Sequence, residues 1–223
     1  MNSWWCGLVV AVISLPSGVS AQTPSREPRF EVTGAAGLQG GADLAAQNGD
    51  LRANSTPPQP FTLFTTESRV AQSWLTEGRV GWRVTPRITV EGRLGYSRPT
   101  LEVSAGADTE GAPPITIVER IDQYVVDAGV VIRLDEVRIA GLMPYAAAGA
   151  GYLRQLHEGL TVIEQGHVYH VGGGVNRELW TPNGRLVRAA GLRVDARVYF
   201  LAGGVAPDVV TQGTVTAGIF VRF

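Results

Sequence analysis

Apolar and polar residues alternate along most of the chain, which is typical of β-strands with two different faces. The clearest example spans residues 68–84. Its even positions carry Val70, Trp74, Val80, Trp82 and Val84. Its odd positions are mostly polar or charged. A soluble strand usually runs about 5–6 residues, whereas about 9–11 tilted residues cross a bilayer. The length of this segment therefore favours a membrane-spanning strand.

Eight segments of this kind are separated by polar connections rich in Gly and Pro. Their ranges are 29–40, 68–84, 88–103, 116–134, 144–156, 166–179, 187–202 and 211–223. An even number of antiparallel strands lets a closed barrel return both ends of the chain to one side. The connections after the first and third segments are long and polar, and those after the second, fourth and sixth are tighter. This asymmetry predicts extracellular loops at one end and periplasmic turns at the other.

The short stretch 85–87, Thr-Pro-Arg, predicts a tight turn between the second and third segments. The register that follows places Arg79 opposite Arg93, with Glu77 and Glu91 as their diagonal neighbours. Two like charges directly opposite each other are destabilising. We therefore expect the two carboxylates to bridge the two guanidinium groups.

The start of the chain looks like a secretory leader. An apolar run from Cys6 to Leu15 precedes Val-Ser-Ala, and we expect cleavage after Ala21. Residues 22–223 would then form one domain without cysteine. Alternation alone also fits a soluble, lipocalin-like barrel, because it does not say which face is inside. The leader, the long strands and the terminal Phe together favour the membrane.

The last segment has an apolar face that ends on the terminal residue. This face comprises Val215, Ala217, Ile219, Val221 and Phe223. The segment resembles the terminal strand of small eight-stranded outer-membrane barrels of the OmpA-transmembrane and OmpW type, although Val221 stands where an aromatic residue is frequent. The resemblance implies an all-β fold, an eight-stranded antiparallel up-and-down transmembrane barrel. It also implies location in the outer membrane and recognition of the Phe223 strand by the barrel assembly machinery.

With the apolar face toward lipid, the other face lines the lumen. The charged residues assigned to it are Glu31, Glu77, Arg79, Arg83, Glu91, Arg93, Asp127, Arg133, Arg154, Glu178, Arg193, Asp195 and Arg197. An eight-stranded barrel is just wide enough for side chains to fill it. We therefore expect Arg-carboxylate pairs to plug the lumen.

Aromatic residues on the apolar face are expected at the membrane interfaces. They are Trp74, Trp82, Tyr96 and Phe223. Trp74 and Trp82 are separated by about 20 Å along the barrel axis at ~3.3 Å per residue and a tilt near 40°. This spacing fits an apolar band about 25 Å tall with an aromatic girdle at each edge.

The remaining features limit the chemistry. A net charge of -1 gives no basic surface for nucleic acid. No phosphate loop or Cys/His metal cluster is found, so neither a cofactor nor a metal is expected. His157, His167 and His170 are the only candidates for lipid-modifying catalysis, but His167 and His170 should face opposite sides of a strand. We interpret all three as polar residues at loop ends.

Two functions follow from this interpretation. The first is a non-catalytic envelope protein with a charge-plugged lumen that acts through its extracellular loops in envelope integrity or surface interaction. The second is a narrow, porin-like conduit for a small solute.

Overall fold

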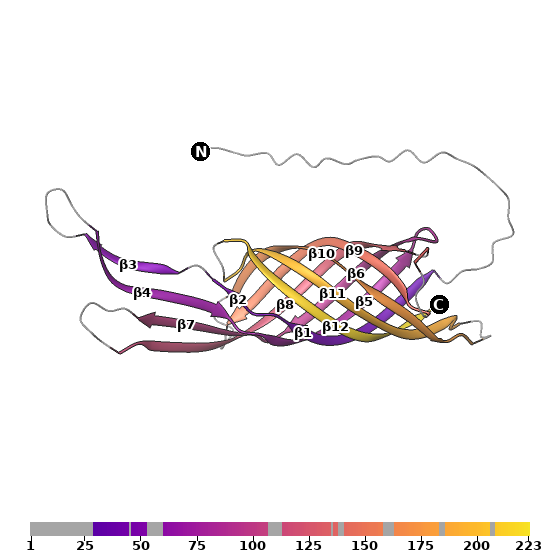
Figure 1. The fold of residues 1–223 in the computed structure, drawn as a ribbon, viewed down its shortest axis with the longest axis horizontal. Coiled ribbons are helices and arrows are strands. Elements are labelled where there is room, and N and C mark those ends of the chain that lie inside the picture. Colours follow the sequence, from indigo (N-terminus) through magenta and orange to yellow (C-terminus); the bar gives the residue numbers. More distant parts are fainter. Residues whose placement is uncertain are drawn as a thin grey trace, which may run out of the picture.

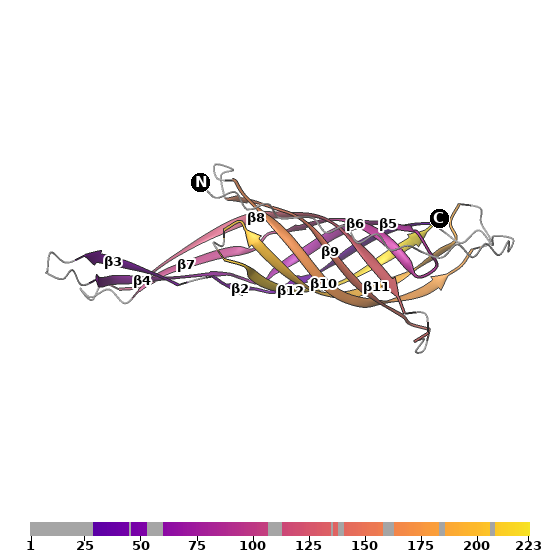
Figure 2. The ribbon, with the colours of Figure 1, turned by 90° about the horizontal axis from the view of Figure 1, so that it is seen from above.

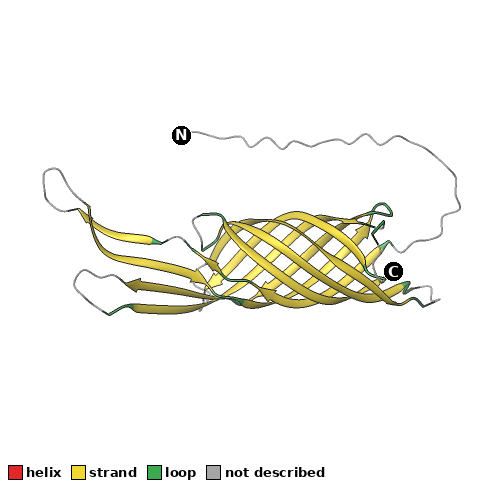
Figure 3. Cartoon of the chain, viewed as in Figure 1, coloured by secondary structure: helices red, strands yellow, loops and turns green. Residues whose placement is uncertain are grey.

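The computed structural model describes residues 29–44, 46–52, 60–106, 113–134, 136–137, 141–157, 163–182, 186–205 and 208–223. The predicted leader, with Cys6 and the expected cleavage after Ala21, lies outside these ranges. Every regular element in the described ranges is a β-strand (Figure 3). Within them, no helix is long and apolar enough to cross a membrane.

Eight of the strands close into an antiparallel barrel (Figure 1). They are β1 (Phe30–Gln39), β5 (Ser73–Arg83), β6 (Ile88–Ser97), β8 (Ile115–Arg133), β9 (Met143–His157), β10 (Ile163–Trp180), β11 (Ala189–Gly203) and β12 (Val210–Arg222). Each strand pairs with the next in this order, and β12 pairs with β1. The predicted eight-stranded up-and-down barrel is confirmed.

A second sheet continues beyond the barrel, at the end opposite the C-terminus (Figures 1 and 2). It contains β2 (Ala42–Asp43), β3 (Gln47–Arg52), β4 (Pro60–Val70), β7 (Thr100–Gly106) and the beginning of β8. We call this sheet the extension. The sequence predicted long loops here, and the structure corrects this because β4 and β7 pair with each other and with their neighbours.

Two of the predicted strands are interrupted where the barrel meets the extension. The segment 68–84 breaks at Ala71 and Gln72, and the segment 88–103 breaks at Arg98 and Pro99. Proline has no N–H for a strand ladder, so a break at Pro99 is expected from its chemistry. The backbone remains bonded, because the Ala71 N–H donates to the Thr100 carbonyl at 2.8 Å.

The break at Ala71 and Gln72 shifts the alternation of the two faces, so the residues before it point to the opposite side from the one predicted. Val70 was expected to face lipid, but it is buried with Leu101 and Ile121 in an apolar cluster. Arg69 was on the polar face of the predicted strand, yet it is exposed and forms an ion pair with Glu102 at 2.7 Å. The hydrogen bond to Glu102 and its negative charge raise the pKa of Arg69.

Strand β9 faces the opposite way from the prediction. The assignment of Arg154 to the lumen would place Tyr145 and Ala147 on the lipid-facing side of this strand, but both are buried inside the barrel. The outward positions of β9 are Ala146, Ala148, Ala150, Tyr152 and Arg154. Both faces of β9 carry small residues, so hydrophobicity alone could not distinguish them.

The tight turn between β5 and β6 has the expected register. The Val84 N–H donates to the Ile88 carbonyl at 2.9 Å, and the Ile88 N–H donates to Thr85 Oγ1 at 3.0 Å. Arg79 lies directly opposite Arg93, as predicted. The turn thereby fixes the position of the charges on these two strands.

The outer surface of the barrel is apolar and carries aromatic residues near both ends. Trp82 and Phe223, which are 52% and 38% exposed, lie near the end with the C-terminus. Trp74 and Tyr96, which are 73% and 37% exposed, lie near the extension. An outward apolar belt with aromatic residues at its edges fits the hydrocarbon layer of a membrane and its two interfaces.

Candidate functional site in the barrel lumen

Polar side chains fill the interior of the barrel. Those that are buried there include Thr33, Gln39, Glu77, Arg79, Glu91, Arg93, Gln123, Asp127, Gln155, His170, Asn176, Arg193, Asp195, Arg197, Gln212, Thr214, Thr216 and Arg222. Because successive side chains of a strand point to opposite faces, each of these side chains points into the lumen. Because a buried charge is costly unless it is paired, the pairs decide whether this interior is stable.

The like charges on β5 and β6 are bridged by carboxylates. Glu77 forms an ion pair with Arg79 on its own strand and another with Arg93, at 2.9 Å, on the neighbouring strand. Arg93 also binds Asp127 on β8 at 2.5 Å. Thr216 on β12 donates its hydroxyl proton to Glu77 at 2.9 Å. Each of these guanidinium groups therefore has at least one anion beside it.

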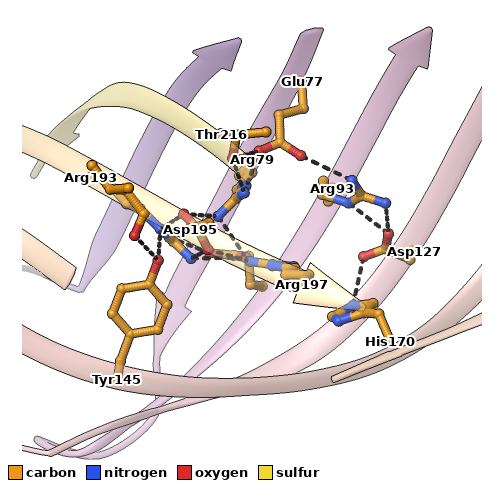
Figure 4. A network of polar contacts seen from close by, with 12 residues as sticks. Glu77, Arg79, Arg93, Asp127, Tyr145, His170, Arg193, Asp195, Arg197 and Thr216 are labelled. Atoms are coloured by element: carbon orange, nitrogen blue, oxygen red, sulfur yellow. Dashed lines mark hydrogen bonds and ion pairs between the residues drawn. The ribbon is translucent and has the colours of Figure 1, made fainter. Parts of the chain in front are cut away.

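A second set of ion pairs crosses the lumen, as Figure 4 shows in part. Glu91 on β6 accepts from Arg193 at 2.5 Å and from Arg197 at 2.9 Å, and both arginines lie on β11. Asp195, between them on β11, binds Arg79 on β5 at 2.8 Å. Strand β11 is not adjacent to β5 or β6 in the sheet. These bonds therefore connect opposite walls of the barrel.

Aromatic rings support the guanidinium groups. Arg193 donates through Nε to the Tyr145 hydroxyl at 2.9 Å and also lies over the Tyr145 ring, 4.7 Å from its centre. Arg93 lies over the Tyr199 ring at the same distance of 4.7 Å. A cation over an aromatic face is stabilised by the ring quadrupole. The inward position of Tyr145, which the sequence analysis missed, is therefore part of the network.

His170 belongs to this network as well. It was interpreted as a polar residue at a loop end, but it is buried, and its Nε2 lies 3.3 Å from Asp127. Its ring also packs against Tyr199, with 5.3 Å between ring centres. His167 is exposed on the other face of β10, so the expectation that the two histidines point in opposite directions is confirmed.

Further charges lie toward the C-terminal end of the barrel. Arg222 forms ion pairs with Glu31 at 2.6 Å and with Glu178. Arg83 and Arg133 are half-buried at the ends of β5 and β8. The assignment of Arg154 to the lumen is wrong: this residue is exposed on the outer face, because β9 has the opposite phase.

Four glutamines form a layer across the lumen toward the extension. Gln39 on β1 donates to Gln212 on β12 at 2.7 Å, and Gln155 on β9 donates to Gln123 on β8 at 2.8 Å. Gln123 donates to Gln39 at 3.4 Å, which joins the two pairs across the barrel. This layer could not be found from the sequence, because each of these strands contributes a single glutamine, far from the others in the sequence.

Little space is left between these side chains. A cavity lined by Glu91, Asp127, His170 and Arg197 has a volume near 0 Å³, and one between the glutamine layer and Arg93 has about 10 Å³. A cavity needs about 10–15 Å³ to hold one water molecule. Among the described residues, no group of His, Cys, Asp and Glu has an arrangement suited to a metal ion.

His157 lies apart from the lumen network. It is at the end of β9, where Nδ1 lies 2.9 Å from Glu119 and Nε2 lies 3.6 Å from Glu164. His157, His167 and His170 thus occupy the rim, the outer face and the interior, respectively. This separation leaves them without a shared site.

Comparisons with known proteins show the fold. No family model matches the sequence, and no curated protein matches it. Among solved structures, Neisserial surface protein A is 15% identical with a TM-score of 0.51, covering 87% of this chain and 96% of its own. Outer membrane protein OprG from Pseudomonas aeruginosa is 10% identical with a TM-score of 0.48, covering 88% and 97%. The outer-membrane protease OmpT from Escherichia coli is 8% identical with a TM-score of 0.44, covering 92% and 100%.

The closed eight-stranded barrel, its apolar outer belt and its polar interior define a transmembrane β-barrel of the bacterial outer-membrane class. The protein is accordingly an outer-membrane protein embedded in the lipid bilayer. Its particular role depends on what its lumen and its extension do.

Proposed function

We propose that this protein is a non-catalytic outer-membrane barrel whose lumen is closed by ion pairs and whose extension acts in surface interaction or envelope integrity. The observation that carries the closed lumen is the contact of Glu91 with Arg193 and Arg197, because it joins two opposite walls of the barrel. An ion or solute would have to break these contacts in a nearly dry environment in order to pass. Such a step leaves buried charges without partners and is therefore costly.

The extension supports the second part of the proposal. It lies at the end of the barrel that carries the long connections, which is the extracellular end in outer-membrane barrels. The side chains of Ile115, Ile117 and Val118 in β8 are 65%, 64% and 61% exposed there. Exposed apolar residues on a projecting sheet favour contact with another molecule.

Biogenesis follows from the same proposal. The chain is exported by its leader, cleaved after Ala21, and inserted by the barrel assembly machinery, which recognises the strand that ends at Phe223. The outward side chains of β12, which include Val215 and Ile219 at 58% and 62% exposure, provide the apolar face that such recognition requires.

Conductance tests the closed lumen against the porin-like alternative. The purified, refolded protein is inserted into planar bilayers, and current is recorded over a range of voltages. We expect no steady unitary current. A reproducible conductance in the native protein would contradict the plug and favour a conduit for small solutes.

Substitution of the histidines tests the absence of catalysis. Cells that carry His157→Gln, His167→Gln or His170→Gln should show the same lipid profile as cells with the native protein, because the three side chains share no site. If the native protein altered the lipid profile of the cells and one of the variants no longer did so, this result would instead support an enzyme.

A further inference from the structure

The outer face of the barrel changes from aromatic to polar along a single line near the extension. Tyr96, Tyr124 and Tyr152 face outward on the adjacent strands β6, β8 and β9. The next outward residues toward the extension are Arg98, Asp122 and Arg154. Aromatic residues mark the level of lipid headgroups in membrane barrels. The polar row therefore lies where headgroups begin.

The charges in this row are not balanced. Asp122 is the carboxylate of the row, and it accepts an ion pair from Arg98 at 3.3 Å and a hydrogen bond from the Tyr96 hydroxyl at 2.7 Å. Among the described residues, Arg154 makes no ion pair and no hydrogen bond through its side chain. Its positive charge is thus left to face the headgroup layer.

The other carboxylates near Arg154 are also engaged. Glu119 on β8 and Glu164 on β10 both contact His157, at 2.9 and 3.6 Å. The phase of the strands places His157 and Arg154 on different faces of β9. Among the described residues, no carboxylate therefore neutralises Arg154, and its exposed guanidinium group is open to an anion.

We propose that Arg154 binds the phosphate of a lipid headgroup in the leaflet at the extension end of the barrel. Tyr124 and Gln165 lie directly opposite Arg154 on its two neighbouring strands. Residues in such positions have Cβ atoms about 4.5–5.5 Å apart, so both side chains can donate to the same anion. A guanidinium group matches the paired oxygens of a phosphate. His167, two residues after Gln165 on β10, is diagonal to Arg154 and is a further donor.

The surface below Arg154 fits the rest of such a lipid. Ala146, Ala148 and Ala150 are exposed on β9 and leave a shallow strip. Larger side chains border the strip on both sides of Ala148, with Val130 on β8 at 41% exposure and Val171 on β10 at 51%. An acyl chain can lie along this strip while its headgroup reaches Arg154. This arrangement favours a phospholipid or a phosphorylated glycolipid over free phosphate.

The test measures lipid retained by the purified protein in detergent, with native mass spectrometry as the readout. The probes are diphosphoryl lipid A, the same lipid without phosphates, and inorganic phosphate alone. We expect saturable binding of the phosphorylated lipid only. Arg154→Gln should weaken this binding at least about fivefold, which is about 1 kcal/mol. Arg154→Lys, which keeps the charge but loses the paired donors, should bind more weakly than the native protein and more tightly than Arg154→Gln.

Arg177→Gln is the matched control, because Arg177 is an exposed, outward arginine on β10 near the other end of the barrel. It should bind lipid as the native protein does. Heat-modifiable migration on a gel shows that each variant is folded. Equal binding by native protein and Arg154→Gln, equal binding of the dephosphorylated lipid, or saturable binding of inorganic phosphate would overturn the proposal.

Discussion

Individual charges in the lumen are stable because each is shared among several partners. Arg193 contacts Glu91, Asp195, Glu31 and the Tyr145 hydroxyl, at 2.5, 3.0, 3.3 and 2.9 Å. Its own side chain is only 2% exposed. Removing such a residue therefore does more than delete one ion pair, because it takes a buried cation away from Glu91 and Asp195 at once.

Arg193→Met should therefore lower the free energy of unfolding strongly. Methionine has a similar length but no charge, so we expect a loss of about 3–5 kcal/mol, measured by urea titration of the protein in lipid vesicles. Arg87→Met is the control, since Arg87 pairs with Glu136 at 2.9 Å with side chains 63% and 79% exposed. The control should lose less than about 1 kcal/mol. Similar losses in both variants would show that the lumen pairs do not stabilise the barrel.

The Tyr145 hydroxyl offers a finer test of the same network. Tyr145→Phe removes the acceptor of the Arg193 Nε proton and the donor of a 3.5 Å hydrogen bond to the Val194 carbonyl, so we expect destabilisation of about 1 kcal/mol in the same titration. Tyr152→Phe changes an outward tyrosine on the same strand, 40% exposed, and should change stability by less than about 0.5 kcal/mol. If the outward variant proved the more damaging, the assignment of the two faces of β9 would be wrong.

At the scale of strands, some glycines lie where two neighbouring strands approach closely, whereas others have open space beside them. A Cβ atom on Gly151 would lie 2.2 Å from the Val126 carbonyl oxygen and 2.4 Å from Asp127 Cβ, both on β8. A Cβ atom on Gly78, on the outer face of β5, would meet no heavy atom within 4 Å. The same substitution should thus have different effects at these two positions.

Gly151→Ala should impair folding, because its methyl group can be accommodated only if the backbones of β8 and β9 move apart. Overpacking of this kind costs about 1–3 kcal/mol. Gly78→Ala should fold as the native chain does. The fraction of heat-modifiable protein after refolding into detergent measures both. A normal folded fraction for Gly151→Ala would mean that β8 and β9 are not as close as described.

Strand β9 also shows how far the sequence could be interpreted. The strands with charges on one face and large apolar residues on the other, such as β5 and β6, could be assigned a direction because a period of two separates the faces. On β9, alanine and glycine occupy both faces, so the inward position of Tyr145 and the outward position of Arg154 could not be deduced. The glutamine layer and His170 depend on contacts between distant strands, which alternation does not reveal. The extension was missed because its strands are interrupted at Gln72 and Pro99 and look polar.

At the scale of the whole molecule, the described part of the chain forms two hydrogen-bonded sheets that meet at the mouth of the barrel. The cluster of Val70, Leu101 and Ile121 joins them, and Leu44 and Val205 pack against it. Among the described residues, the ion pairs that cross the lumen come from barrel strands and not from β2, β3, β4 or β7. The proposed closure of the lumen and the proposed surface for interaction should therefore be separable.

A shortened chain tests this separation. Residues 42–70 and 101–120 are each replaced by a short Gly-Ser turn, which removes the extension but keeps the paired residues of all eight barrel strands. The barrel should still migrate in a heat-modifiable way, and its loss of stability should stay within about 3 kcal/mol, because Ile121 is the main barrel residue that loses its apolar cover. In planar bilayers the shortened protein should remain without steady current, since Glu91, Arg193 and the glutamine layer are unchanged. If a steady current appears only after shortening, the extension and its apolar cluster close the barrel, and the lumen ion pairs alone do not.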